Sequence, residues 1–179
     1  MAKKLLLLIL LYFFITAPIQ ASEPEGTNAN SNTKIVILVR HAEKQADQGK
    51  DPSLTPAGQR RAIQLKLALK DMPLTALYAT PFKRTKETLN PISENREITI
   101  KVIDVKGGIS MHVNKVLKAI RAENGNVLVV GHSNTIPLII KAFGGPKVDD
   151  IAEKDYNNIY LLSLPAEGNA GLIHTRYGQ

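Results

Sequence analysis

Two polar residues, Arg40 and His41, stand at the end of an apolar run that begins at Lys34. The arginine is permanently charged and can hold two oxygens of an anion at once, and a neutral histidine is a nucleophile. Residues of the same types follow downstream, Arg84 in ATPFKRTKET and His132 in VLVVGHSNTIP. These four side chains have the chemistry needed for one pocket that handles phosphate.

The reaction that suits this set is phosphoryl transfer. The loose transition state spreads negative charge over three equatorial oxygens, so catalysis depends mostly on positioning and on positive charge. A neutral imidazole attacks phosphorus and gives a phosphohistidine, which water then hydrolyses. A second histidine, held cationic by the adjacent anion, can donate a hydrogen bond to an equatorial oxygen.

Short apolar runs alternate with helical patterns along the chain. The runs predict strands over 34–39, 74–78, 99–102 and 126–130, followed by two closing strands over 158–164 and 171–177. Helices are predicted over 55–70, 81–94, 111–123 and 133–143. Thr55 and Thr80, each followed by proline, are expected to cap the first two helices, and Ser133 with Asn134 to cap the fourth.

Strands that are apolar along their whole length and separated by helices predict an α/β fold. We expect a three-layer α/β/α arrangement, with a mostly parallel sheet and short helices on both faces. Ligands bind such sheets at the carboxyl ends of the strands. Arg40, His41, Arg84 and His132 all follow strand ends, so they are expected to converge on one edge, where helix N-termini also favour an anion.

The first 33 residues are expected to lie outside the fold. Lys3 and Lys4 precede an apolar core over 5–15 and a small-residue exit at Ala21, which is the pattern of a signal peptide over 1–21. That core is too short for a membrane span of about 20 residues, so no stable membrane insertion is expected after cleavage. Residues 22–33 are polar and predict a flexible leader. The domain is expected over 34–179, exported to the periplasm or beyond, without disulfides because cysteine is absent.

The charge of the chain favours an anionic partner. The formal net charge is +7, or +5 once the two lysines of the signal segment are set aside. A nucleic-acid surface usually combines a basic stripe with stacking aromatic residues. Here the basic residues are dispersed and tryptophan is absent, so we expect a small phosphorylated substrate and no nucleic acid. The sequence sets no oligomeric state.

The motifs VRHAE, LTPAGQRRA, YATPFKRTKET and VLVVGHSNTIP resemble, in order and spacing, the signature of the histidine phosphatase superfamily in its phosphoglycerate mutase-like branch. The resemblance covers the chain from Lys34 onward. It implies His41 as the phosphorylated nucleophile, with Arg40, Arg84 and His132 binding the transferred group. It also implies a reaction on an open α/β sheet without a metal or another cofactor.

Two positions depart from that family pattern. Family members usually carry glycine where Ala42 stands, a small change that negative φ would tolerate. Larger relatives place a glutamate that protonates the leaving group in a loop after the third strand. In this chain the corresponding segment, KVIDVKGGIS, has Asp104 as its only carboxylate. Asp104 is therefore the proposed acid and Glu43 its runner-up. If neither reaches the leaving oxygen, good leaving groups such as phosphohistidine or acyl phosphates are favoured.

Other functions stay open. The chain could be a protein phosphohistidine phosphatase, or a binding protein that retains the pocket without turnover. A metal hydrolase would use His41, Glu43 and His132 as ligands. The adjacent arginine would repel the cation, and no closely spaced second histidine follows on a helix as zinc proteases require. The most favoured function is an exported, metal-independent phosphatase acting on phosphomonoesters through a phosphohistidine.

Overall fold

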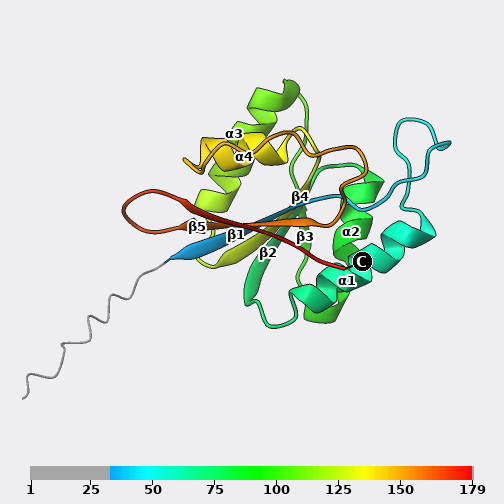
Figure 1. Cartoon of the computed structure of the whole chain (residues 1–179), viewed down its shortest axis with the longest axis horizontal. Coiled ribbons are helices and arrows are strands. Elements are labelled where there is room, and N and C mark those ends of the chain that lie inside the picture. Colours follow the sequence, from blue (N-terminus) through cyan, green and yellow to red (C-terminus); the bar gives the residue numbers. More distant parts are fainter. Residues whose placement is uncertain (1–32, 179) are drawn as a thin grey trace, which may run out of the picture. The chain divides into compact units, whose positions relative to one another are not determined.

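The computed structural model describes residues 33–178, which form a six-stranded sheet with helices on both faces (Figure 1). The predicted signal peptide and the predicted leader up to residue 32 lie outside these described residues. The strands are β1 (Lys34–Arg40), β2 (Leu74–Ala79), β3 (Ile100–Val102), β4 (Asn126–Gly131), β5 (Asn158–Leu164) and β6 (Gly171–Arg176). The helices are α1 (Pro56–Ala68), α2 (Lys83–Arg96), α3 (Gly108–Arg121) and α4 (Ile136–Ala142).

The sheet is parallel through most of its width. The strand order is β3-β2-β4-β1-β5-β6, in which the first four strands are parallel and β5 and β6 are antiparallel to their neighbours. Helices α3 and α4 cover one face, and α1 and α2 cover the other (Figure 1). The predicted three-layer α/β/α fold with a mostly parallel sheet is confirmed.

The core lies on both faces of the central strands. Alternate residues of β1 and β4 enter two apolar layers, one packed against α3 and α4 and the other against α1 and α2. The side chains from Val36 to Val39 are fully buried. Burying such a side chain stabilises the fold by about 1.5–3 kcal/mol, so β1 is a rigid support for the residues that follow it.

Helix α1 begins as the sequence predicts. Pro56 is its first residue, and the Thr55 hydroxyl accepts a hydrogen bond from the backbone N–H of Gly58 at 3.0 Å. The Thr55 N–H also donates to the Glu43 carbonyl at 2.8 Å. A Cβ on Gly58 would collide with that same carbonyl, so only glycine lets α1 pack this closely on the segment after β1.

The predicted caps of two other helices are wrong. Helix α2 begins at Lys83, and its first turn has no side-chain cap. The Thr80 hydroxyl instead lies 2.9 Å from the Thr85 hydroxyl. Helix α4 begins at Ile136 rather than at Ser133, again without a side-chain cap. The Thr80 hydroxyl therefore contacts a side chain inside α2 instead of capping its first backbone N–H groups, and the Thr135 hydroxyl before α4 accepts from the backbone N–H of His132.

Within residues 33–178, no helix combines the length and the apolar character that crossing a membrane requires.

Candidate active site

An open pocket of about 340 Å³ lies at the carboxyl edge of the sheet and collects the four predicted side chains. It is lined by Arg40, His41, Lys44, Phe82, Arg84, Val105, Ile109, His132, Ser133, Asn134, Thr135 and Glu153. A larger hollow of about 630 Å³ lies between α1 and α2, but it contains no arginine or histidine. The smaller pocket is therefore the candidate site for an anion.

Strand register explains why the two histidines meet. Arg40 pairs with Gly131 across parallel strands β1 and β4, so the next residues, His41 and His132, leave the sheet side by side. Their ring centroids are 5.4 Å apart. The backbone N–H of His41 donates to the Gly131 carbonyl at 3.0 Å and extends the pairing one step beyond the strands.

His41 is oriented as a nucleophile. Its side chain is only 3% exposed, and Nδ1 lies 2.8 Å from the Ala42 carbonyl. Because a carbonyl only accepts, Nδ1 carries the proton and Nε2 keeps its lone pair. Burial, together with the charges of Arg84 and Arg40, lowers the pKa of His41 from 6.5 to about 4. The imidazole is therefore neutral at physiological pH.

His132 is held by a short chain of hydroxyls. Its Nε2 lies 3.1 Å from the Thr80 hydroxyl, which in turn lies 2.9 Å from that of Thr85. Thr85 donates to backbone carbonyls of Thr80 and Phe82, so the chain is satisfied if Nε2–H donates to Thr80. Burial and the nearby His41 lower the pKa of His132 to about 3. In the free protein this ring is also neutral, and a bound anion would favour its charged form.

The two guanidinium groups present unused donors. The Nε atoms of Arg40 and Arg84 are buried and have no hydrogen-bond partner among the described residues. Buried donors are rarely left unpaired, since desolvation without a partner costs about 1–3 kcal/mol. Two such donors beside a neutral imidazole are expected where a multidentate anion binds.

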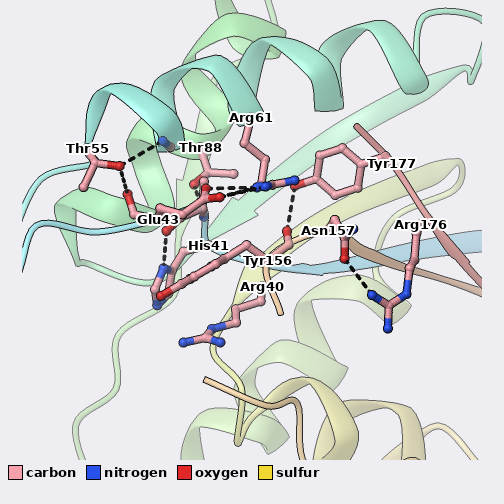
Figure 2. A network of polar contacts seen from close by, with 12 residues as sticks. Arg40, His41, Glu43, Thr55, Arg61, Thr88, Tyr156, Asn157, Arg176 and Tyr177 are labelled. Atoms are coloured by element: carbon pink, nitrogen blue, oxygen red, sulfur yellow. Dashed lines mark hydrogen bonds and ion pairs between the residues drawn. The ribbon is translucent and has the colours of Figure 1, made fainter. Parts of the chain in front are cut away.

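Arg40 is fixed from one side by the loop that precedes β5. Its Nη1 donates to the carbonyls of Ala152 and Glu153 at 2.8 and 2.9 Å. The ring of Tyr156 stacks on the guanidinium at 4.3 Å, and Figure 2 shows it between Arg40 and His41. Nη1 is occupied in this way and Nη2 lies 3.4 Å from the Glu153 carboxylate, so Nε is the donor left without a partner among the described residues.

Arg84 enters from the first turn of α2. Its guanidinium lies 4.3 Å from the centre of the Phe82 ring, and the same ring makes an edge contact with His132 at 5.4 Å. Burial lowers the pKa of Arg84, but the ordinary value is so high that the group stays charged. Phe82 therefore positions both a cation and an imidazole of the site.

Neither of the predicted acids lies in the pocket. The Asp104 carboxylate accepts from Lys115 Nζ at 2.8 Å and from the backbone N–H of Lys106. These hydrogen bonds lower the pKa of Asp104, opposite to the direction that a proton donor needs. Glu43 pairs with Arg61 on α1 at 2.7 Å, and its carboxylate is directed toward that arginine and away from His41 (Figure 2). The assignment of either carboxylate as the acid is therefore corrected.

The same ion pair bears on the metal alternative. Glu43 is committed to Arg61, so it does not complete a ligand set with His41 and His132. No group of three histidine or carboxylate side chains in the described part of the chain is spaced to hold a metal ion.

Sequence reasoning missed three residues of the site. Thr80 was assigned to a helix cap, although its place directly after a strand could have suggested a site role. Tyr156 and Glu153 lie more than 110 residues from Arg40 along the chain, and no local motif marks them. Only the return of the chain into β5 brings them beside the arginine.

Two arginines and two histidines around one pocket, at the carboxyl edge of a mostly parallel sheet, define a protein of the α/β phosphatase class. The family model for the histidine phosphatase superfamily (branch 1) matches residues 36–105, which include Arg40, His41 and Arg84. This match confirms, over residues 36–105, the resemblance predicted from the motifs. No curated protein sequence matches it.

Solved structures share the fold well beyond the matched segment. The protein histidine phosphatase SixA complexed with tungstate has a TM-score of 0.61 at 18% identity, covering 79% of this chain and 96% of its own. A protein assigned as phosphohistidine phosphatase SixA, from Nakamurella multipartitia, gives 0.57 at 22%, covering 82% and 98%. A mycobacterial glucosyl-3-phosphoglycerate phosphatase gives 0.54 at 11%, covering 73% and 90%. At these identities the likeness establishes the fold.

Proposed function

We propose that the protein is an exported phosphatase that hydrolyses phosphomonoesters, without a metal, through a phosphohistidine formed on His41. The observation that carries this proposal is the state of His41. The ring is neutral, and its Nδ1–H is fixed on a carbonyl, so Nε2 holds a lone pair beside two arginines with unpaired donors. A binding site alone needs no such oriented nucleophile.

The first chemical step follows from that geometry. Nε2 of His41 attacks phosphorus, the P–O bond to the leaving group breaks, and its electron pair goes to the leaving oxygen. The guanidinium edges of Arg40 and Arg84 hold the equatorial oxygens as charge develops on them. His132 takes up a proton when the anion binds and donates from its ring to one of these oxygens.

The second step regenerates the enzyme. Water attacks the phosphorus of phosphohistidine, the P–N bond breaks, and its electron pair returns to Nε2. Inorganic phosphate leaves through the open pocket. Because positive charge is supplied by two arginines and by His132, the reaction needs no metal ion to neutralise the phosphoryl group.

A second candidate function is dephosphorylation of phosphohistidine in proteins. It is favoured by the open pocket, which a protein surface could approach, and by the two SixA structures that share this fold. Comparing turnover of a small phosphomonoester with that of a phosphohistidine-bearing protein separates the two functions, since both would form the same intermediate on His41.

Trapping the intermediate tests the proposal. We expect an alkaline quench, in which the P–N bond of phosphohistidine survives, to recover one labelled histidine, His41, after mixing with an aryl phosphate radiolabelled in its phosphoryl group. His41→Ala should abolish labelling and lower turnover by more than about a hundredfold without unfolding the domain. His174→Gln is the matched control, because it removes an imidazole on β6 that contacts Asn158 and Tyr160 outside the pocket.

Three results would contradict the proposal. Retained hydrolysis in His41→Ala would remove the nucleophile. Binding of vanadate or tungstate to the wild-type protein, without labelling or turnover of any ester, would instead favour a phosphate-binding protein. Turnover that survives exhaustive chelation is expected, whereas its loss and recovery with added metal would favour the metal hydrolase.

Export is the part of the proposal that depends on residues 1–21. The basic start, the apolar core and the exit at Ala21 support cleavage after that residue. Mass spectrometry of the protein purified from the cell envelope should then show Ser22 as its first residue. An intact N-terminus in the cytosolic fraction would contradict export while leaving the catalytic proposal unaffected.

A further inference from the structure

Of the twelve residues that line the pocket, Glu153 is the only one with a carboxylate. It lies in the loop between α4 and β5, and its Oε2 is 3.4 Å from Nη2 of Arg40. The pocket otherwise offers cations, imidazoles, small polar groups and apolar side chains. If a carboxyl group among the lining residues donates a proton in this pocket, that group is Glu153.

The position of Glu153 relative to His41 fits the path of the leaving group. His41 is buried, whereas the Glu153 side chain is 76% exposed at the mouth of the same pocket. In-line displacement sends the leaving oxygen away from the attacking Nε2, and hence outward from the buried end of the pocket. The departing oxygen therefore passes on the side where Glu153 stands.

Arg40 couples Glu153 to the substrate. The guanidinium is held by backbone carbonyls on Nη1, and the Glu153 carboxylate shares Nη2 with any bound oxoanion. A phosphoryl dianion and a carboxylate on one guanidinium repel each other, so a bound substrate weakens the contact between Glu153 and Arg40. The exposed carboxyl group can exchange protons with solvent.

We propose that Glu153 is the catalytic acid of this enzyme, which protonates the leaving oxygen as the P–O bond breaks. This inference rests on the proposed function. The carboxyl O–H gives its proton to the leaving oxygen, which departs as an alcohol, and Glu153 becomes a carboxylate. In the second step that carboxylate accepts a proton from the attacking water, so the acid form is restored when inorganic phosphate is released.

The test compares two esters that differ in their need for a proton. A nitrophenyl phosphate has a leaving group that departs as an anion, whereas an alkyl phosphate needs protonation. For Glu153→Gln, kcat/KM with the alkyl ester should fall about a hundredfold or more, and with the nitrophenyl ester it should stay within about threefold. Because kcat/KM reports formation of the phosphoenzyme, the nitrophenyl rate also shows that the variant is folded.

The second step supplies an independent signature. Without the carboxylate that activates water, Glu153→Gln should release nitrophenol in a burst and accumulate the His41 phosphoenzyme. The matched control is Asp149→Asn, which removes a carboxylate four positions away that pairs only with the exposed Lys147. This control should hydrolyse both esters like the wild type.

Several outcomes would overturn the inference. An equal loss of kcat/KM on both esters would make Glu153 a support for Arg40. A gain with both esters would make it an anion that merely competes with substrate for Arg40. A wild-type protein that neither labels His41 nor hydrolyses either ester would remove the proposed function, and the inference with it.

Discussion

The buried and the exposed halves of the pocket are built differently. The buried half, which we call the floor, consists of Arg40, His41, Arg84 and His132, and the exposed half, the rim, includes Lys44, Ile109 and Glu153. Floor residues follow strand ends or open a helix and are fixed by short hydrogen bonds or ring contacts. Of the rim residues, Lys44 and Glu153 stand on connecting segments and Ile109 lies in the first turn of α3.

This difference separates two tasks of the enzyme. Under the proposed function, the floor binds what every phosphomonoester shares, the phosphoryl group. The rim would contact the leaving group, which differs between substrates in structure and in its need for a proton. A change in the floor should therefore slow all substrates alike, whereas a change in the rim should depend on the substrate.

Arg84 gives the largest expected effect in this comparison. Arg84→Ala removes charge and a bidentate donor from the transition state, so turnover of every ester should fall by about 10²–10³-fold. Inhibition by inorganic phosphate or vanadate should weaken in parallel. Steady-state kinetics with two esters measures both effects, and Arg84→Lys should recover part of the loss because it restores charge without the fork.

A matched change outside the pocket completes that experiment. Arg121→Ala removes an arginine near the end of α3, where it lies over the Phe143 ring. It should leave kinetics and phosphate inhibition unchanged. Unaltered phosphate affinity in Arg84→Ala would take this arginine out of the floor.

The next effect is a shift in pH dependence. His41 and His132 have lowered pKa values, about 4 and about 3, because both rings are buried beside cations. In the unfolded chain a histidine takes up its proton near pH 6.5. In nuclear magnetic resonance, the imidazole signals of the urea-unfolded chain should therefore titrate near pH 6.5. In the folded protein at pH 5, the signals of His41 and His132 should still be those of neutral rings.

The sign of the stability change follows from these pKa values. As the pH falls below 6.5, the unfolded chain binds protons that the folded protein does not, so the free energy of unfolding decreases toward pH 4. Bound phosphate should offset part of this loss, since it favours the charged form of His132. If both rings titrated near pH 6.5 in the folded protein, they would be exposed to water and the lowered pKa values would be wrong.

The floor of the pocket could be predicted from the sequence, and the rim could not. The floor was predictable because parallel strands end at one edge, and the register of Arg40 with Gly131 brings the two histidines together. The rim was not predictable, because its residues depend on where connecting loops fold back against the pocket. Asp104 looked suitable by its place after β3, but Lys115 from α3 captures its carboxylate. Glu153 carried no signal in the chain around it.

The predicted caps of α2 and α4 were wrong for a related reason. Thr80 was predicted as an N-cap, yet its hydroxyl contacts the ring of His132. Helix α4 begins after Thr135 rather than at the predicted Ser133 and Asn134, and the Thr135 hydroxyl accepts from the backbone N–H of His132. Capping patterns report the preference of a local segment. The Thr80 hydroxyl has a competing partner that follows a different strand, and the Thr135 hydroxyl has one three residues earlier in its own segment.

Asp104 gives the smallest expected effect and the most direct contrast with Glu153. Asp104→Asn breaks an exposed ion pair with Lys115 outside the pocket, and such pairs contribute little. The rate on alkyl and on nitrophenyl phosphate should therefore stay within about twofold of the wild type. Kinetics on the same two esters that are used for Glu153→Gln makes the comparison direct.

A loss confined to the alkyl ester in Asp104→Asn, with none in Glu153→Gln, would identify Asp104, in the loop after β3, as the acid. The rim would then rearrange when substrate binds, since the Asp104 carboxylate would have to leave Lys115 before it could protonate a leaving oxygen.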